Sequence, residues 1–152
     1  MKRPTYSILP GDPVRFKFDG RTIIGHVLSI ILTNKPPYYK YTASTPFSRF
    51  HSCVSIHPKD ITLNKNGFSY RNENPDDIGL FVGTDVVYKH PINGKQRRGR
   101  IIKATLICDV VKYVVHDFDT GSLSSLSASF IQLPVSEALI QNKNWEPINL
   151  VH

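Results

Sequence analysis

Apolar and polar residues alternate along several short stretches of the chain, and this alternation predicts strands rather than helices. Residues 11–28 alternate in this way on both sides of the dipeptide Asp19-Gly20. Residues 83–102 repeat the arrangement around Asn93-Gly94. An Asx-Gly pair between two β-forming runs is typical of a β-hairpin. The pattern therefore predicts two hairpins with these dipeptides at their tips.

The two hairpins begin a longer internal repeat. Residues 39–42 in the first copy correspond to residues 112–115 in the second, and apolar strands at 60–63 and 130–133 close the copies. A set of four or five short strands buries a core only by curling onto itself. The sequence therefore predicts an all-β fold of two tandem five-stranded barrels. The expected boundaries are residues 1–66 for the first barrel, an Asn-rich linker at 67–79, and residues 80–152 for the second barrel.

One stretch near the end of the chain has a helical pattern. Pro134 or Ser136 near its start and Asn142 at its end are typical of helix termini. We therefore expect a short helix at residues 134–141, after the last strand of the second copy. Its apolar residues would seal the end of the second barrel.

Composition adds a strong positive charge to this picture. The 152 residues carry a formal net charge of +7, and the sequence pI is about 9.5. A basic surface favours polyanionic partners such as DNA or RNA. The longest apolar run, residues 30–32, is far shorter than the roughly 20 residues that cross a bilayer, so we expect no membrane partner. Cys53 and Cys108 are expected to be reduced, buried thiols of an intracellular protein.

The chain lacks the sequence signs of an enzyme. No nucleophile elbow, phosphate loop or dinucleotide fingerprint occurs in it. His51, Cys53 and His57 match no zinc-binding spacing, and the serine-rich residues 122–127 predict a turn that leads into a strand. We expect a non-enzymatic protein with no metal, no cofactor and no small-molecule substrate.

The densest charge lies in residues 95–103, which begin in the second hairpin turn and enter the next strand. Cations on a rigid hairpin can neutralise phosphates and release counterions, and arginine adds forked hydrogen bonds. Since Ile101 should point inward, we expect Arg98 and Arg100 to point outward, and Arg97 to be exposed near the turn. Lys89, His90 and Lys112 would extend this patch. The predicted contacts to duplex DNA or another nucleic acid are Lys95, Arg97, Arg98, Arg100 and Lys103, assisted by Arg15, Lys17 and Arg21.

The repeated strand, Asx-Gly turn and second strand, followed by the aromatic-acidic-Gly turn at residues 113–121, resembles the Tudor family. From about residue 9 to residue 141 the layout is similar to the tandem Tudor module of DNA-damage checkpoint mediator proteins. That resemblance implies SH3-like barrels and a nuclear, chromatin-associated scaffold or recruitment domain, with histone tails or another protein among its partners. Residues 11–28 also resemble the KOW motif, which implies an RNA- or ribosome-associated protein. A third hypothesis is a cytoplasmic protein-interaction module, such as a viral or phage assembly factor.

Tudor domains hold methylated lysine or arginine in a box of aromatic rings with an acid, and this sequence fills that box only in part. In the first copy Arg21, Ile23 and Ala43 stand where rings are needed. In the second copy Lys95 and Arg97 would repel a cation. We therefore predict that the first copy does not bind methyl-lysine through this box. The residues that could form an incomplete cage are Phe18, Tyr88, Phe118 and Asp119.

Overall fold

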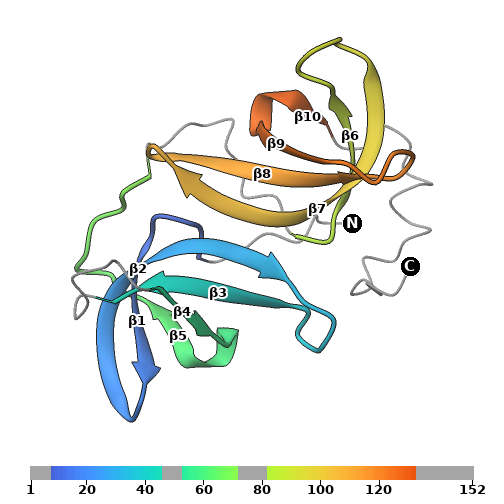
Figure 1. Ribbon diagram of the computed structural model, residues 1–152. Helices are drawn as coiled ribbons and strands as arrows, with labels where there is room; N and C mark the ends of the chain where they lie inside the picture. The colour runs from blue at the N-terminus through green and yellow to red at the C-terminus, as the bar shows by residue number, and fades with distance from the viewer. Residues whose placement is uncertain (1–7, 46–52, 72–81, 133–152) are drawn as a thin grey trace, which may run out of the picture.

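The computed structural model describes residues 8–45, 53–71 and 82–132, which form ten strands and two short 3-10 helices (Figure 1). Every strand pair is antiparallel, so the predicted all-β class is confirmed. The helix expected at residues 134–141 lies outside the described residues. Among those that are described, no helix is long and apolar enough to cross a membrane.

The strands fall into two sets of five with the same neighbours. The first unit contains β1 (Pro13–Phe18), β2 (Arg21–Leu32), β3 (Tyr39–Ser44), β4 (Cys53–Ile56), η1 (Pro58–Asp60) and β5 (Ile61–Leu63). The second unit contains β6 (Asp85–Lys89), β7 (Gln96–Ile107), β8 (Val110–Asp117), β9 (Leu123–Ser127), η2 (Ala128–Phe130) and β10 (Ile131–Gln132). The strand order is β5-β1-β2-β3-β4 in the first unit and β10-β6-β7-β8-β9 in the second.

The two units are joined through β2 and β7. Residues 29–31 of β2 pair with residues 103–105 of β7. The result is one ten-stranded antiparallel sheet rather than two separate ones. Figure 1 shows the long, curved strands β2 and β7 side by side at the centre of the molecule. The expectation that the two copies pack against each other is therefore met by a backbone ladder.

The strand registers show which residues of the two units are equivalent. Val14 pairs with Gly25 in the first unit, and Val86 pairs with Gly99 in the second. A β-bulge follows three residues after each glycine, at Leu28 and at Ile102. Tyr41 of β3 is equivalent to Tyr113 of β8, because they pair with equivalent residues of β2 and β7. The sequence comparison, which placed residue 39 opposite residue 112, was wrong by one position.

Equivalent residues also meet at the junction between the units. Ile30 and Ala104 each lie five residues after the glycine of their unit, and they pair with each other across the β2–β7 ladder. On either side of this pair, Ser29 pairs with Thr105, the equivalent of Ile31, and Ile31 pairs with Lys103, the equivalent of Ser29. A local pseudo-twofold axis therefore passes through the Ile30–Ala104 pair.

The turns follow the sequence prediction in the first hairpin more closely than in the second. Asp19 and Gly20 have φ angles of 53° and 73°, as a two-residue hairpin turn of this kind requires. Asn93-Gly94 lies at the tip of a longer loop, in which the Gly94 amide donates to the His90 carbonyl at 2.8 Å. Both cysteines are exposed, so their predicted burial is wrong. Cys108 lies in the β7–β8 turn, with φ at 50°, and Cys53 begins the short strand β4.

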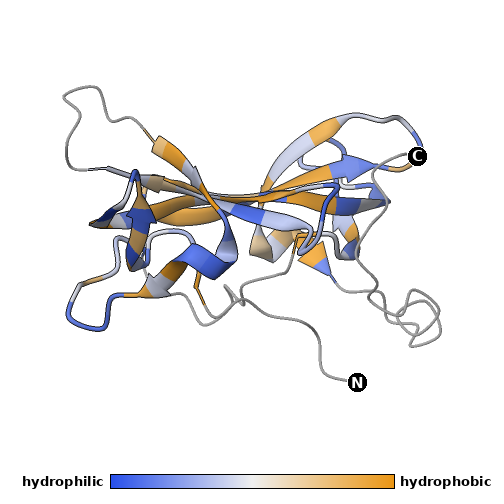
Figure 2. Cartoon of the chain, turned by 90° about the horizontal axis from the view of Figure 1, so that it is seen from below, coloured by the Kyte–Doolittle hydropathy of each residue, from blue (hydrophilic) through white to orange (hydrophobic). Residues whose placement is uncertain are grey.

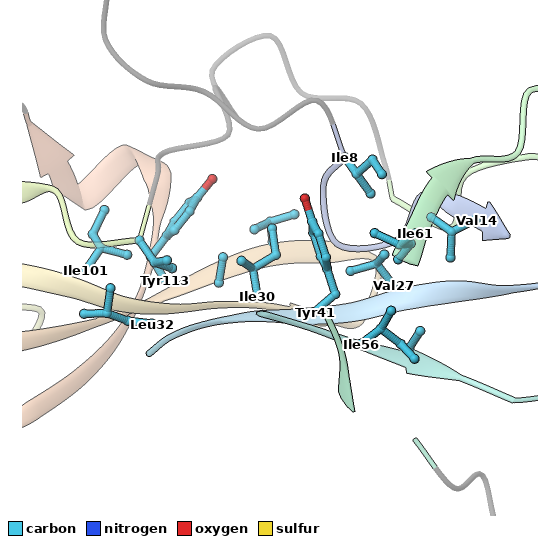
Figure 3. Packing of buried hydrophobic residues seen from close by; sticks show 14 of the residues in the cluster. Ile8, Val14, Val27, Ile30, Leu32, Tyr41, Ile56, Ile61, Ile101 and Tyr113 are labelled. Atoms are coloured by element: carbon cyan, nitrogen blue, oxygen red, sulfur yellow. The ribbon is translucent and has the colours of Figure 1, made fainter. Parts of the chain in front are cut away.

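The buried apolar residues form one cluster that extends through both units. Figure 2 shows apolar segments along the strands of both halves. Figure 3 shows the rings of Tyr41 and Tyr113 on the same side of the sheet, with Ile30 between them. Gly25 and Gly99 allow the strands to approach closely, because an added Cβ would lie 2.2 Å from the Ser44 carbonyl oxygen and 2.5 Å from the His116 carbonyl oxygen.

Residues 64–71 fold back onto the first unit, although the linker was expected to begin at residue 67. The Tyr70 amide donates to the Gly11 carbonyl at 2.8 Å, and Arg71 pairs with Asp12 at 2.9 Å. The ring of Tyr70 also stacks on His26, with centroids 3.7 Å apart. These contacts fasten the start of the connection to the first unit.

Candidate nucleic-acid interface

The basic residues of β7 divide between the two sides of the strand. Gly99 and Ile101 are buried on the side of β7 that faces the core, as predicted for Ile101. Arg98, which is exposed, and the partly buried Arg100 therefore point outward. Lys103 follows the bulge at Ile102 and lies on the same outward side, because its neighbour Ala104 is buried.

Arg97 points the other way and is not a free cation. Its Nε donates to Asp117 Oδ2 at 2.6 Å, and its Nη2 donates to Oδ1 at 3.3 Å. The side chain of Asp117 is fully buried, whereas that of Arg97 is 24% exposed. The expectation that Arg97 is exposed is wrong, because the β7–β8 ladder brings it to a carboxylate 20 residues further along the chain.

Asp117 is the centre of a polar network inside the second unit. The Tyr88 hydroxyl donates to Asp117 Oδ2 at 2.5 Å, and the amides of Asp119 and Thr120 donate to Oδ1 at 2.8 and 2.9 Å. The Arg97 guanidinium, the Tyr88 hydroxyl and the two amides hold the pKa of Asp117 well below its usual range. Burial, together with the hydrogen bond to Asp117, raises the pKa of Tyr88 to about 12. This network is structural, since its charged groups satisfy one another.

Arg100 is also paired with an acid. Its Nε donates to Asp85 Oδ1 at 2.7 Å, and its guanidinium lies over the Phe118 ring at 5.4 Å from the centroid. Asp85 is on the neighbouring strand β6, directly opposite Arg100 in register. Of the predicted β7 cations, Arg98 and Lys103 are the two outward-pointing ones that have no ion pair among the described residues.

A continuous surface crosses the junction of the two units, on the side of the sheet opposite Ile30, Tyr41 and Tyr113. It contains the outward side chains of β3, β2, β7 and β8, and we call it the shared face. The strand registers arrange it in two rows. One row runs through Thr42, Ser29, Thr105 and Lys112, and the other through Lys40, Ile31, Lys103 and Val114.

The shared face is basic and contains three residues with hydroxyl groups, of which Ser29 is buried. Its two rows contain three lysines and no acidic residue, and none of these lysines has an ion pair within the described part of the chain. The Ser29 and Thr42 hydroxyls are hydrogen-bonded to each other at 2.5 Å. Sequence reasoning named Lys103 and Lys112 but missed Lys40, because only the β2–β7 pairing brings the two units together here.

The basic residues expected in the first unit lie elsewhere. Arg15 and Lys17 are exposed on β1 and line an open groove of about 290 Å³ with Thr22, Lys59 and Thr62. Arg21 is at the tip of the β1–β2 hairpin. Figure 1 shows this tip and the β6–β7 tip, near Lys95, at opposite ends of the molecule. The eight predicted nucleic-acid contacts therefore do not form one site.

The four residues of the incomplete cage do not converge either. Tyr88 is 1% exposed and belongs to the core, whereas Phe118 is covered on one side by Arg100. Phe18 is in the other unit, at the β1–β2 hairpin, and Asp119 is in the turn after β8. In the described residues, no three His, Cys, Asp or Glu side chains gather as metal ligands.

Three other aromatic rings gather on the first unit. The centroids of the Phe68 and Tyr70 rings are 5.4 Å apart with an angle of 64° between the ring planes, and His26 stacks on Tyr70. His26 Nε2 is also within 3.1 Å of the Phe68 carbonyl oxygen. This cluster depends on the way residues 64–71 fold back onto the first unit.

No protein-family model matches this chain, and no curated protein matches it. Among solved structures, it is similar to the SHH1 SAWADEE domain in complex with an H3K9me3 peptide. The match has a TM-score of 0.34 and 10% sequence identity, and it covers 81% of this chain and 97% of that chain. A similarity at this level decides neither fold nor ligand. The class of the protein is therefore defined by its own architecture, a basic all-β chain of two repeated antiparallel units.

Proposed function

We propose that this chain is a non-enzymatic, tandem Tudor-like module that binds nucleic acid through the outward face of β7. The proposal takes residues 1–66 and 80–152 as two SH3-like barrels. The observation that carries it is the placement of Arg98 and Lys103 on one side of β7, without acidic partners among the described residues. Lys112 is close to Lys103 on the neighbouring strand β8.

The chemistry of this face suits phosphate groups. Unpaired cations on a rigid strand can neutralise neighbouring phosphates and release their condensed counterions. Arg98 lies opposite Val87 in the β6–β7 register, and the carboxylate of β6, Asp85, is paired with Arg100. The Asp85–Arg100 ion pair links β6 to β7 beside Arg98. With phosphates as the main contacts, we expect little preference for base sequence.

The biological setting of the proposal comes from the family resemblance alone. A tandem Tudor layout suggests a nuclear scaffold or recruitment domain on chromatin, including a DNA-damage checkpoint protein, with histone tails or another protein as further partners. Duplex DNA is then the expected nucleic acid. The KOW resemblance would make it RNA instead, and the binding experiment separates the two.

The test is a fluorescence anisotropy titration of labelled duplex DNA and of RNA at several salt concentrations. We expect Arg98→Glu/Lys103→Glu to weaken binding by about tenfold or more and to flatten the salt dependence by about two units. The matched control is Arg15→Glu/Lys17→Glu, which makes the same change of charge on β1 and should have a much smaller effect.

Two results would overturn the proposal. Equal losses in the β7 variant and in the β1 control would show that net charge, and not the β7 face, decides binding. No binding of the wild-type protein to either nucleic acid at low salt would leave a protein-interaction module as the better account. Circular dichroism of both variants shows whether they stay folded.

A further inference from the structure

The pseudo-twofold axis relates the basic residues of the shared face to one another. Lys40 and Lys112 each precede the equivalent tyrosines Tyr41 and Tyr113, so they occupy equivalent positions on opposite sides of the axis. Lys103 lies between them, opposite Ile31 of β2. Positive charge is therefore distributed across both units and is not confined to the second.

The strand geometry fixes the span of these lysines. With strands about 4.8 Å apart and a rise of about 3.4 Å per residue, the Cα atoms of Lys40 and Lys103 are about 10 Å apart, and those of Lys40 and Lys112 about 16 Å. The grooves of duplex DNA are about 6 and 12 Å wide. Lysines at this spacing can reach phosphates on both strands of a double helix.

The other side chains of the shared face favour a double helix over a single strand. Single-stranded nucleic acids are held by aromatic rings on which the bases stack, and neither row of the shared face contains an aromatic residue. Thr42 and Thr105 lie among the lysines instead, whereas Ser29 is only 4% exposed. The Thr105 hydroxyl donates to the Leu28 carbonyl, so Thr42 is the hydroxyl that can donate to a phosphate oxygen, with Ser29 as the donor in their mutual hydrogen bond. The lysines are partly buried, so their aliphatic stems are held by neighbouring side chains.

We infer that the nucleic-acid site is composite and double-strand-specific. A duplex lies across β3, β2, β7 and β8, contacts Lys40 of the first unit and Lys103 and Lys112 of the second, and continues toward Arg98. The inference rests on the proposed function and extends it, because it requires both units and names the class of nucleic acid. The Ile30–Ala104 junction then lies beneath the middle of the ligand.

The decisive variant is Lys40→Gln, since Lys40 belongs to the unit that lacks the β7 cluster. We expect it to weaken duplex binding severalfold and to flatten the salt dependence by about one unit. Lys40→Arg keeps the charge and should bind like the wild type. Lys65→Gln removes one charge from the exposed loop after β5 and should leave the salt dependence unchanged. A labelled single strand of the same sequence should bind more weakly than the duplex.

The outcomes separate this inference from the proposed function. If Arg98→Glu/Lys103→Glu abolishes duplex binding and Lys40→Gln does not affect it, the composite site is wrong and the proposed function stands. If the single strand binds as tightly as the duplex, the double-strand specificity is wrong. If the wild-type protein binds no nucleic acid, both fail. DNA and RNA duplexes of one sequence distinguish B-form from A-form ligands, and thermal unfolding of each variant controls for loss of structure.

Discussion

The two units differ at three equivalent positions. The first unit has Phe16, Ile23 and Thr45 there, and only the last has a polar side chain. The second unit has Tyr88, Arg97 and Asp117, where Arg97 and Asp117 form an ion pair and the Tyr88 hydroxyl donates to Asp117. The glycines, the bulges and the core tyrosines are common to both. The backbone plan therefore does not depend on the network, which is an addition of the second unit.

The outward faces of the two units also differ, and again the charged residues are in the second unit. Ile24 and His26 of β2 are equivalent to Arg98 and Arg100 of β7, and Ser29 is equivalent to Lys103. Ile24 is 54% exposed, and His26 is covered by Tyr70. The first unit thus presents a neutral, partly aromatic surface where the second presents cations. One duplicated framework carries two different surfaces, so the units need not bind the same ligand with the same strength.

Truncation of the buried acid should have the largest effect on stability. We expect Asp117→Ala to lower the free energy of unfolding by about 3 kcal/mol, because it leaves Arg97 and the Tyr88 hydroxyl without their partner. The equivalent Thr45→Ala should cost about 1 kcal/mol or less. Urea unfolding of both variants measures the difference. Equal losses would contradict the view that the network belongs to the second unit alone.

The two units share one backbone plan, so we predict that their equivalent glycines behave alike. Gly25→Ala and Gly99→Ala should each destabilise the protein, by about 2 to 3 kcal/mol, since the new Cβ meets a carbonyl oxygen in both units. The loss should be greater at Gly25, where the approach is closer. Thermal or urea unfolding would reveal it, and Gly20→Ala, at a turn with open space but a φ of 73°, shows the cost of backbone strain without a clash. A neutral effect at one of the two sites would show that the units are not built alike there.

Acid should act on the second unit through Asp117. Because its pKa is lowered in the folded protein, the ionised form stabilises the fold above the ordinary aspartate pKa of about 4, and this contribution is lost as the pH falls below that value. The stability difference between the wild type and Asp117→Asn should therefore be constant near neutral pH and shrink below about pH 4. Urea unfolding at a series of pH values measures it. A difference that stays constant down to pH 2 would rule out this role of the charge.

The smallest expected effect comes from making the outer surfaces alike. Ile24→Arg places a cation at the position equivalent to Arg98 and should change stability by less than about 0.5 kcal/mol, because the side chain is exposed. If a duplex crosses both units, the salt dependence of its binding should steepen by about one unit. Anisotropy titrations of the wild type and this variant give the comparison. An unchanged slope would mean that the ligand does not reach this part of the first unit.

Local patterns in the sequence predicted most of the strand plan. The Asx-Gly dipeptides located both hairpins, and the β-type alternation placed Ile101 inward and Arg98 outward. These features depend on neighbouring residues, so a single sequence contains them. The burial of Cys53 and Cys108 was predicted wrongly. Their β-forming neighbours do not show whether a residue lies in the middle of a strand, at its end or in a turn.

The electrostatic partners could not be predicted in the same way. Asp85 and Asp117 are 15 and 20 residues from the arginines that they bind, and only the registers of β6, β7 and β8 bring them together. Lys40 joins Lys103 through a three-residue ladder between the repeats, which has no sequence signature. Two of the basic residues that look like one cluster in the sequence, Arg97 and Arg100, are therefore neutralised by acids. Lys40, which the sequence analysis did not name, lies near Lys103, which has no ion pair among the described residues.

The ladder between β2 and β7 has the symmetry of a homodimer contact within a single polypeptide. In an isologous interface each contact occurs twice with the partners exchanged, and only residues on the axis meet their own equivalents, as Ile30 meets Ala104 here. A unit on its own would expose the backbone groups of residues 29–31 as a free strand edge, and such edges recruit other chains. The covalent connection supplies the second copy at a high effective concentration, so the edge is closed without any dependence on the amount of protein. The first unit produced alone would be expected to self-associate through this edge.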